Sequence, residues 1–209
     1  MILFEKPGRG NTEKTLQIAV DKAESLDAAI VIASNSGSTA KDLIRILKDR
    51  GSVVPVVVVT SVYGMKQPGR NEFPEALRGE LEAEGVKVVT AAHALSGAER
   101  SFSNRFHGQG PIEIMAHTLR MFSQGVKVGV ECATMALDAG AVPYGKPVIS
   151  VGGSGGGADS AIVLTPAYTH TILDTRIMRS CASHIDFSMQ CLHQAETRNF
   201  GTAGIANIQ

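Results

Sequence analysis

The chain has 209 residues, of which 44% are hydrophobic and 19% charged, and its formal net charge is zero. This length and composition predict one folded domain with a core on both sides of a sheet. Balanced charge without a lysine or arginine block argues against nucleic-acid and membrane-surface binding. No run reaches the ~18 apolar residues of a membrane span. The three cysteines form no CxxC pair, which indicates a reducing, cytoplasmic setting.

Strand-like and helix-like patterns alternate along the chain, which predicts an α/β fold with a largely parallel sheet. Apolar residues at helical spacing predict helices at 16–23 with Asn11 or Thr12 as the cap, at 40–48, around 77–81, from Pro111 to Phe122, and at 130–137. Apolar runs predict strands at 28–33, 53–59, 86–89, 147–151 and 161–164. Residues 93–110 show neither pattern, and so long a connection is expected to be functional or to form a lid.

The turn between the 28–33 strand and the following helix carries the strongest functional signal. Thr39 and Asp42 have the spacing of a capping box, so the helix is expected to begin at this turn. A helix N-terminus directs backbone N–H groups and a positive dipole end at an anion, and the hydroxyls of Ser36, Ser38 and Thr39 can add donors. The turn therefore predicts a phosphate site. An ordinary capped helix at a βα turn is the alternative.

A second glycine-rich turn, residues 152–159, follows the 147–151 strand. Its letters fit a dinucleotide fingerprint (Gly153-x-Gly155-x-x-Ala158) and also a nucleophile elbow centred on Ser154. Both motifs require a helix next, whereas a strand is expected at 161–164. Glycines at the carboxyl end of a strand let a ligand approach the backbone, which is the interpretation we keep beside a flexible hairpin.

Candidates for acid–base chemistry and for metal binding are scattered. His107 and Glu131 are candidates for proton transfer, and Arg105 could anchor an anionic substrate. Near the end of the chain, potential zinc ligands match no common zinc module, so no metal site is predicted. These are Cys181, His184, Cys191 and His193.

Several segments resemble the stand-alone relatives of the pyruvate kinase C-terminal α/β domain. The resemblance covers residues 3–179 and is carried by NTEKTL, ASNSGSTA, YGMKQPGRNEF, HALSGAERSFSNRF, PIEIMAHTLRMFSQGVKVGVE, MALDAG and GGSGGGADSAIVLTPA. It implies a three-layer α/β/α sandwich around a five-stranded, mostly parallel sheet with one antiparallel strand. A single domain at 1–179 and an extension at 180–209 follow from it. A homo-oligomer is also implied.

The resemblance further implies a bound flavin mononucleotide (FMN). In pyruvate kinases the loop equivalent to 34–39 holds the phosphate of a sugar-bisphosphate effector. The implied FMN-binding residues are Ser34, Ser36, Gly37, Ser38 and Thr39 around the phosphate, and Thr60, Gly64, Gly152, Gly153 and Gly155 around the remainder. This chain has Ser154 and Gly156 where a threonine and an arginine are implied.

Three functions follow as hypotheses. The first is an FMN-binding protein, with flavin-dependent oxidoreduction as its activity and Arg105, His107 and Glu131 as the reactive set. The second is a non-catalytic sensor that binds a phosphorylated metabolite. The third, weaker hypothesis is a serine hydrolase built on Ser154. The barrel that carries out phosphoryl transfer in pyruvate kinases has no counterpart here, so that activity is not expected.

Overall fold

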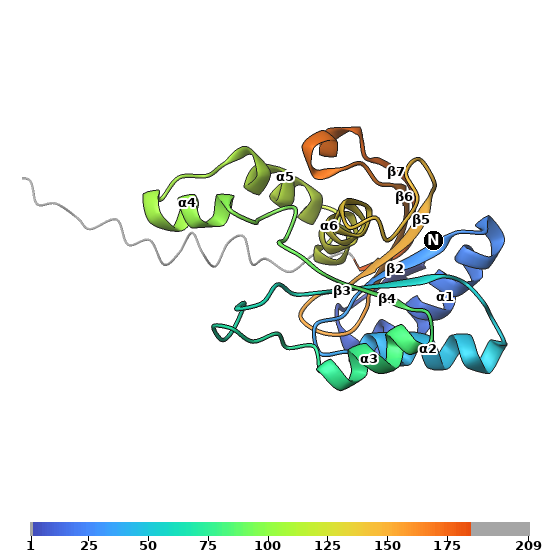
Figure 1. Ribbon diagram of the computed structural model, residues 1–209. Helices are drawn as coiled ribbons and strands as arrows, with labels where there is room; N and C mark the ends of the chain where they lie inside the picture. Colours follow the sequence, from blue (N-terminus) through green and yellow to red (C-terminus); the bar gives the residue numbers. More distant parts are fainter. Residues whose placement is uncertain (1, 185–209) are drawn as a thin grey trace, which may run out of the picture.

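A seven-stranded sheet forms the centre of the computed structural model, which describes residues 2–184 (Figure 1). The spatial order of the strands is β1-β7-β6-β5-β2-β3-β4. Only β6 runs antiparallel to its neighbours. The strands are β1 (Ile2–Phe4), β2 (Ala29–Ala33), β3 (Val56–Thr60), β4 (Lys87–Thr90), β5 (Val148–Gly152), β6 (Ser160–Thr165) and β7 (Arg176–His184). The single antiparallel strand agrees with the prediction, but the described part has seven strands rather than five.

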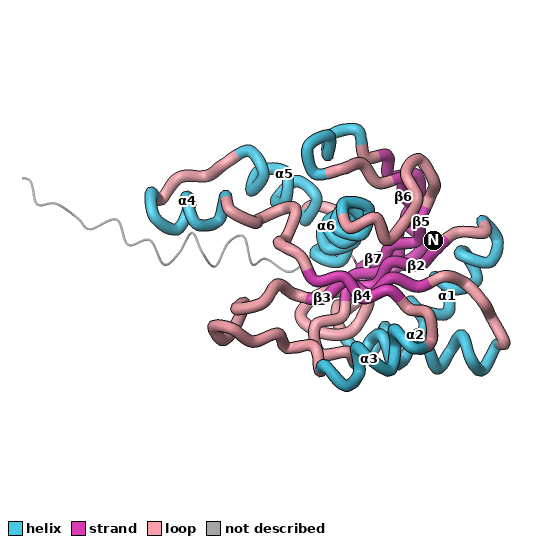
Figure 2. Tube along the Cα trace, in the orientation of Figure 1, coloured by secondary structure: helices cyan, strands magenta, loops and turns pink. Residues whose placement is uncertain are grey.

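Helices cover both faces of this sheet (Figure 2). α1, α2 and α3 lie on one face, and α5 and α6 lie on the other, with α4 projecting beyond α5. The helices are α1 (Thr12–Leu26), α2 (Ser38–Arg50), α3 (Glu75–Ala83), α4 (Glu99–Phe106), α5 (Pro111–Arg120) and α6 (Gln124–Asp138), with 3₁₀ turns at Arg9–Asn11 and Thr169–Asp174. The predicted three-layer α/β/α sandwich is confirmed.

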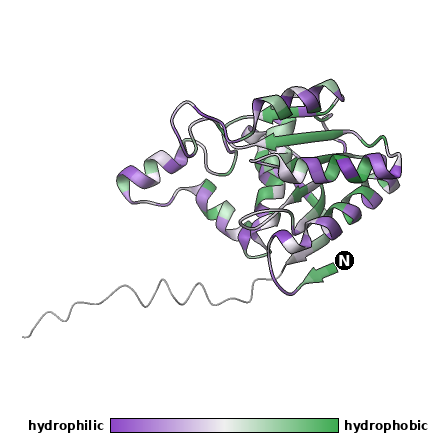
Figure 3. Ribbon diagram, turned by 90° about the horizontal axis from the view of Figure 1, so that it is seen from below, coloured by the Kyte–Doolittle hydropathy of each residue, from purple (hydrophilic) through white to green (hydrophobic). Residues whose placement is uncertain are grey.

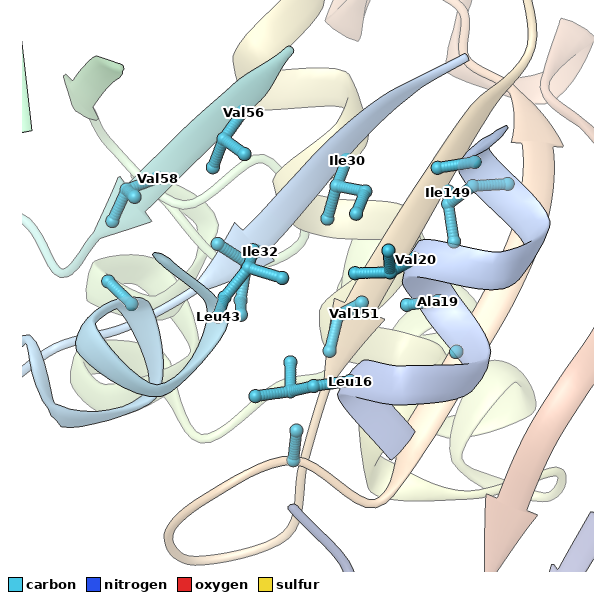
Figure 4. Packing of buried hydrophobic residues seen from close by; sticks show 14 of the residues in the cluster. Leu16, Ala19, Val20, Ile30, Ile32, Leu43, Val56, Val58, Ile149 and Val151 are labelled. Carbon is cyan, nitrogen blue, oxygen red and sulfur yellow. The ribbon is translucent and has the colours of Figure 1, made fainter. Parts of the chain in front are cut away.

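The central strands are apolar on both faces, because helices cover both. Successive side chains of β2 alternate: Ile30 and Ile32 pack among α1 and α2, while Val31 belongs to the core under α6. Figure 4 shows the first of these cores, where Leu16 and Leu43 come in from the two helices. Hydrophobic residues accordingly concentrate on the strands in Figure 3. The sheet is therefore a rigid platform whose strand ends can position a site.

Several element boundaries differ from the sequence prediction. α2 begins at Ser38, and its N-cap residue is Gly37, which makes no side-chain capping bond. The predicted capping box, with Thr39 as the cap and Asp42 as its partner, is therefore wrong. α6 begins at Gln124, six residues before the predicted start, because Ser123 Oγ accepts the N–H of Val126 at 3.0 Å. β3 begins only at Val56.

The segment 93–110 is not a loop throughout, because it contains α4, which has no buried residue. α5 begins at Pro111 as predicted, but Phe122 lies past its end and is 66% exposed. The carboxylate of Glu99 in α4 accepts the N–H groups of Ile112 (3.3 Å) and Glu113 (2.7 Å), so one helix caps the next.

Two strands outside the expected set close one edge of the sheet. β1 pairs with β7 in parallel, and the predicted domain boundary at Arg179 falls inside β7. Cys181, one of the potential zinc ligands, is buried in the hydrophobic core. Cys191 and His193 lie outside the described residues. Within residues 2–184, no cluster of three or more histidine, cysteine or acidic side chains is placed to hold a metal ion. None of the described helices has the length and apolarity to cross a bilayer.

Candidate functional site

A cavity of about 680 Å³ lies beyond the carboxyl ends of β2, β3 and β5. Open α/β sheets bind their ligands at this edge. Its walls come from the β2–α2 turn, the loop after β3, α6, the glycine loop after β5, and the turn before α1. The lining residues are Arg9, Ala33, Ser34, Asn35, Ser36, Ser38, Thr39, Val59, Thr60, Met65, Lys66, Glu72, His93, Gln124, Val128, Glu131, Cys132, Met135, Gly153, Gly155, Gly156 and Gly157.

The β2–α2 turn supplies the polar end of the cavity. Ser34 is buried, and its hydroxyl accepts the N–H of Ala40 in the first turn of α2 at 3.3 Å. The N–H groups of Ser38 and Thr39 have no acceptor among residues 2–184. Ser36 Oγ and Ser38 Oγ lie 3.2 Å apart. Hydroxyls and unpaired main-chain donors thus meet at a helix N-terminus, which is an arrangement suited to a phosphate.

Gly37 is required by the backbone of this turn and does not line the cavity. Its φ is +84°, in the left-handed region that favours glycine. A Cβ at this position would lie 2.1 Å from Leu77 Cδ2, with Phe73 next nearest. The glycine therefore faces α3 and lets α2 begin beside it. Gly37 was expected among the residues around the FMN phosphate; it is absent from the cavity lining, and a side chain there would point into the core.

The glycine loop after β5 is held in place by a buried carboxylate. Asp159 is fully buried, and its Oδ2 accepts the N–H groups of Gly8 (3.0 Å) and Ser154 (3.1 Å). Thr12 Oγ1 accepts the N–H of Ala158 at 3.0 Å. These bonds join the loop to the turn that precedes α1. The loop is therefore anchored at both sides, which argues against a merely flexible hairpin.

The motif alternatives for this loop are not realised. The strand β6 follows the loop where a dinucleotide fingerprint or a nucleophile elbow needs a helix. Ser154 Oγ is buried and has no hydrogen-bond partner among residues 2–184, so no described base activates it.

Besides Gly37, two more predicted ligand-binding glycines, Gly64 and Gly152, are absent from the cavity lining. A Cβ at Gly152 would lie 2.3 Å from the carbonyl oxygen of Gly125, so this glycine permits close packing of α6 on β5. Gly64 has a φ of +77° and donates its N–H to the carbonyl of Arg70 at 2.8 Å, which closes the loop after β3. Both are structural. Gly153 and Gly155 do line the cavity, as predicted.

Thr60 lines the cavity, and its hydroxyl is part of a network at the ends of β3 and β4. Thr60 Oγ1 lies 2.6 Å from Thr90 Oγ1, which accepts from Arg78 Nη2 at 2.6 Å. Asn71 donates to the carbonyl of Ser61 at 2.8 Å. The network fixes the two ends of the 61–73 loop, which carries Met65, Lys66 and Glu72 to the cavity wall.

A buried ion pair lies in α6, which forms one wall of the cavity. Lys127 Nζ is 2.6 Å from Glu131 Oε2, and both side chains are only 6% exposed. The second oxygen, Oε1, accepts the N–H of Leu95 at 3.0 Å. Both carboxylate oxygens are thus engaged, and Glu131 holds the segment after β4 in place. Glu131 was predicted to transfer protons, but in this arrangement neither of its carboxylate oxygens is without a hydrogen bond.

His93 and Cys132 lie near this ion pair and line the cavity. Burial lowers the pKa of the His93 imidazole; Lys127 and Arg100 lower it further, against the opposite effect of Glu131. At neutral pH the imidazole is therefore uncharged. Burial raises the pKa of the Cys132 thiol, and Glu131 adds to the rise, so this cysteine stays protonated and is a poor nucleophile.

Arg105 and His107, two of the three predicted reactive residues, do not line the cavity. Both are exposed: Arg105 is in the last turn of α4, and His107 ends that helix with a φ of +56°. Of the predicted set, the structure brings together Ser34, Ser36, Ser38, Thr39, Thr60, Gly153, Gly155 and Glu131.

Comparison with known proteins defines the family. Residues 13–164 match the family described as pyruvate kinase, alpha/beta domain. The chain belongs to that family. Among solved structures, it is similar to a pyruvate kinase from Cryptosporidium parvum, with 14% sequence identity and a TM-score of 0.35. That match covers 80% of this chain and 22% of the other, so the chain corresponds to a minor part of that protein's length.

Sequence reasoning missed several residues that line the cavity of this pyruvate kinase α/β domain or lie directly behind its wall. β4 is the parallel neighbour of β3, which ends in Thr60, and parallel strands end at the same edge of a sheet. The position of His93 soon after β4 could therefore have predicted that it lies near this edge. Lys127 precedes Glu131 by four residues, which is the spacing of an ion pair on one helix face. This ion pair could therefore also have been predicted from the sequence. Arg9 gave no local signal. It reaches the cavity through contacts that span about 150 residues, between Gly8 and Asp159.

Proposed function

We propose that this protein binds a phosphorylated small molecule at the β2–α2 turn, and we favour FMN as that molecule. The observation that carries the proposal is the cavity wall formed by Ser36, Ser38 and Thr39. It combines hydroxyl groups with main-chain N–H groups, at the first turn of a helix, that have no acceptor within residues 2–184. The cavity volume, about 680 Å³, is within the range of roughly 300–1,000 Å³ of small-molecule sites.

The remainder of the cavity fits the other parts of a flavin nucleotide. Val59, Val128 and Met135 give it apolar surface, and Gln124 and His93 offer hydrogen-bonding groups away from the β2–α2 turn. Gly153 and Gly155 allow the ligand to approach the backbone. An apolar wall with a few polar groups is typical of a cofactor site.

For oxidoreduction, a bound flavin would supply the redox chemistry, and this chain would supply position and electrostatics. The β2–α2 turn would hold the phosphate, and the uncharged His93 imidazole would exchange hydrogen bonds with the ligand. Because Arg105 and His107 lie elsewhere and the Glu131 carboxylate is engaged, we propose no reactive set of those three residues.

The sensor hypothesis is supported by a different observation, namely that three of the four charged side chains that line the cavity are already paired. Lys66 pairs with Glu72, and Lys127 pairs with Glu131. Such a cavity binds an anion without offering a free carboxylate for proton transfer. A sensor would be stabilised by a phosphorylated metabolite but would not transform it.

Two measurements test the proposal. The absorption spectrum of the purified protein, with mass spectrometry of the small molecules released on denaturation, is expected to show FMN. Calorimetric titration of stripped protein with FMN and with riboflavin is expected to show stronger binding of FMN, because only FMN carries the phosphate. Equal affinities would contradict a role of the phosphate in binding, and no binding of either would contradict an FMN site. Thermal stabilisation by a sugar phosphate without FMN binding would favour the sensor.

A cytoplasmic location and a homo-oligomer are also proposals. The location is supported by the cysteine usage together with the absence of a membrane-spanning helix in residues 2–184. Light scattering coupled to size-exclusion chromatography tests the oligomer, and a monomer at micromolar concentration would contradict it.

A further inference from the structure

The charged side chains around the cavity leave one charge without a counter-charge. Four charged residues line it: Arg9, Lys66, Glu72 and Glu131. Lys66 pairs with Glu72 across the 61–73 loop, and Glu131 pairs with buried Lys127. The Arg9 guanidinium has neither an ion pair nor a hydrogen bond with any residue of the described chain. The lining side chains therefore carry one uncompensated positive charge, and the buried Asp159 carboxylate lies behind them, where it accepts the N–H groups of Gly8 and Ser154.

The turn that carries Arg9 is fixed on both sides of that residue. Gly8 donates its N–H to the buried carboxylate of Asp159 at 3.0 Å. Thr12, at the start of α1, accepts the N–H of Ala158 at 3.0 Å. Between them, the Arg9 Cα packs so closely on the glycine loop that a Cβ on Gly157 would lie 2.8 Å from it. The main chain of Arg9 is therefore locked against the cavity wall while its side chain is exposed and unpaired.

The positive groups of the cavity lining suit a phosphate monoester. The first turn of α2 contributes roughly half a positive charge, and Arg9 contributes a full one. A phosphate monoester carries about −1.5 to −2 near pH 7. A phosphate monoester can therefore interact with both positive groups of the lining at once.

We propose that Arg9 is a ligand-binding residue that holds a doubly charged phosphate monoester against the N-terminus of α2. This inference rests on the proposed function and extends it by naming the charge state of the ligand and a residue outside the family match, which begins at residue 13. A guanidinium can donate two parallel hydrogen bonds to phosphate oxygens, so it adds orientation as well as charge.

The experiment compares Arg9→Gln with the wild-type protein, using FMN and riboflavin as probes in calorimetric titrations at low and high salt. Loss of a hydrogen bond to a charged group is expected to weaken FMN binding about tenfold to a hundredfold, and to leave riboflavin binding unchanged. Arg9→Lys should recover part of the loss. The salt dependence of FMN binding should also be smaller in Arg9→Gln.

Lys6→Gln is the matched control, because it removes one positive charge from the same segment but lies outside the cavity lining. It should bind FMN within about twofold of wild type, as expected for a screened charge at a distance. Wild-type FMN affinity in Arg9→Gln, or an equal loss for FMN and riboflavin, would overturn the role of Arg9 alone. Failure of the wild-type protein to bind either FMN or inorganic phosphate would overturn the proposed function and this inference together.

Discussion

Replacement of Ser38 by aspartate should change stability and ligand affinity in opposite directions. Ser38 is the first residue of α2 and lines the cavity, with its hydroxyl 3.2 Å from that of Ser36. A carboxylate at this position would face the positive end of the helix dipole. It should stabilise the unliganded protein by about 0.3–1 kcal/mol. For a domain of this size, that corresponds to a rise in Tm of up to about 2–4 °C.

The same carboxylate would repel a bound phosphate. Two unit charges about 4 Å apart repel each other by about 1 kcal/mol in water and about 4 kcal/mol at an effective dielectric constant of 20. Since about 1.4 kcal/mol corresponds to a tenfold change, FMN affinity should fall between about fivefold and a thousandfold in Ser38→Asp.

Differential scanning fluorimetry without ligand and calorimetric titration with FMN measure the two effects. Ser38→Asn serves as the control of equal size without the charge, and its affinity should stay much closer to that of wild type. A Ser38→Asp protein that binds FMN as well as wild type would refute the phosphate site at this turn. A fall of several degrees in its Tm would refute the assigned helix start.

Three further predictions concern buried polar groups. Glu131→Gln leaves the Lys127 ammonium buried without a counter-charge and should cost about 3–5 kcal/mol in urea denaturation, whereas apolar replacement of both partners should cost much less. Asp159→Ala leaves the N–H of Gly8 and Ser154 unpaired and should lower the free energy of unfolding by about 3 kcal/mol or more. Burial lowers the pKa of His93 in the folded state, so the unfolded chain binds protons more readily. Stability from this residue should be full above its unfolded pKa of about 6.5 and decline as pH falls below it; urea denaturation from pH 8 to 5 should show a smaller decline in His93→Gln than in wild type.

The sequence was informative where local chemistry decides the structure. Pro111 marked the start of α5, and the apolar run before Ser34 marked β2 and the turn after it. α4 was missed because its eight residues carry only one apolar pair at helical spacing, Phe102 and Phe106, and none of its residues is buried. β7 was missed because its pairing with β6 is irregular and several of its apolar residues, such as Ile177, are exposed.

The candidate site was predicted in part for the same reason. The β2–α2 turn is a continuous segment, so its hydroxyl residues could be identified from their order alone. The sequence could not show that Gly37 faces the core, because this orientation depends on Leu77 in another helix. The sequence also could not show that Arg9 lines the cavity, because its position depends on Asp159 and the glycine loop. Contacts between distant segments decide which side chains share a cavity, and these contacts cannot be predicted from local sequence patterns.

The attachment of α4 has a consequence for how the molecule opens in solution. Its contacts include the Glu99 carboxylate on the start of α5, and none of its residues is in the core. Amide protons of α4 should therefore exchange with deuterium through a local opening of low free energy, while those of β2 should exchange only when the whole domain unfolds. Glu99→Gln would weaken the cap and should speed exchange at α4 and the first turn of α5 together, which identifies these two segments as one cooperative unit.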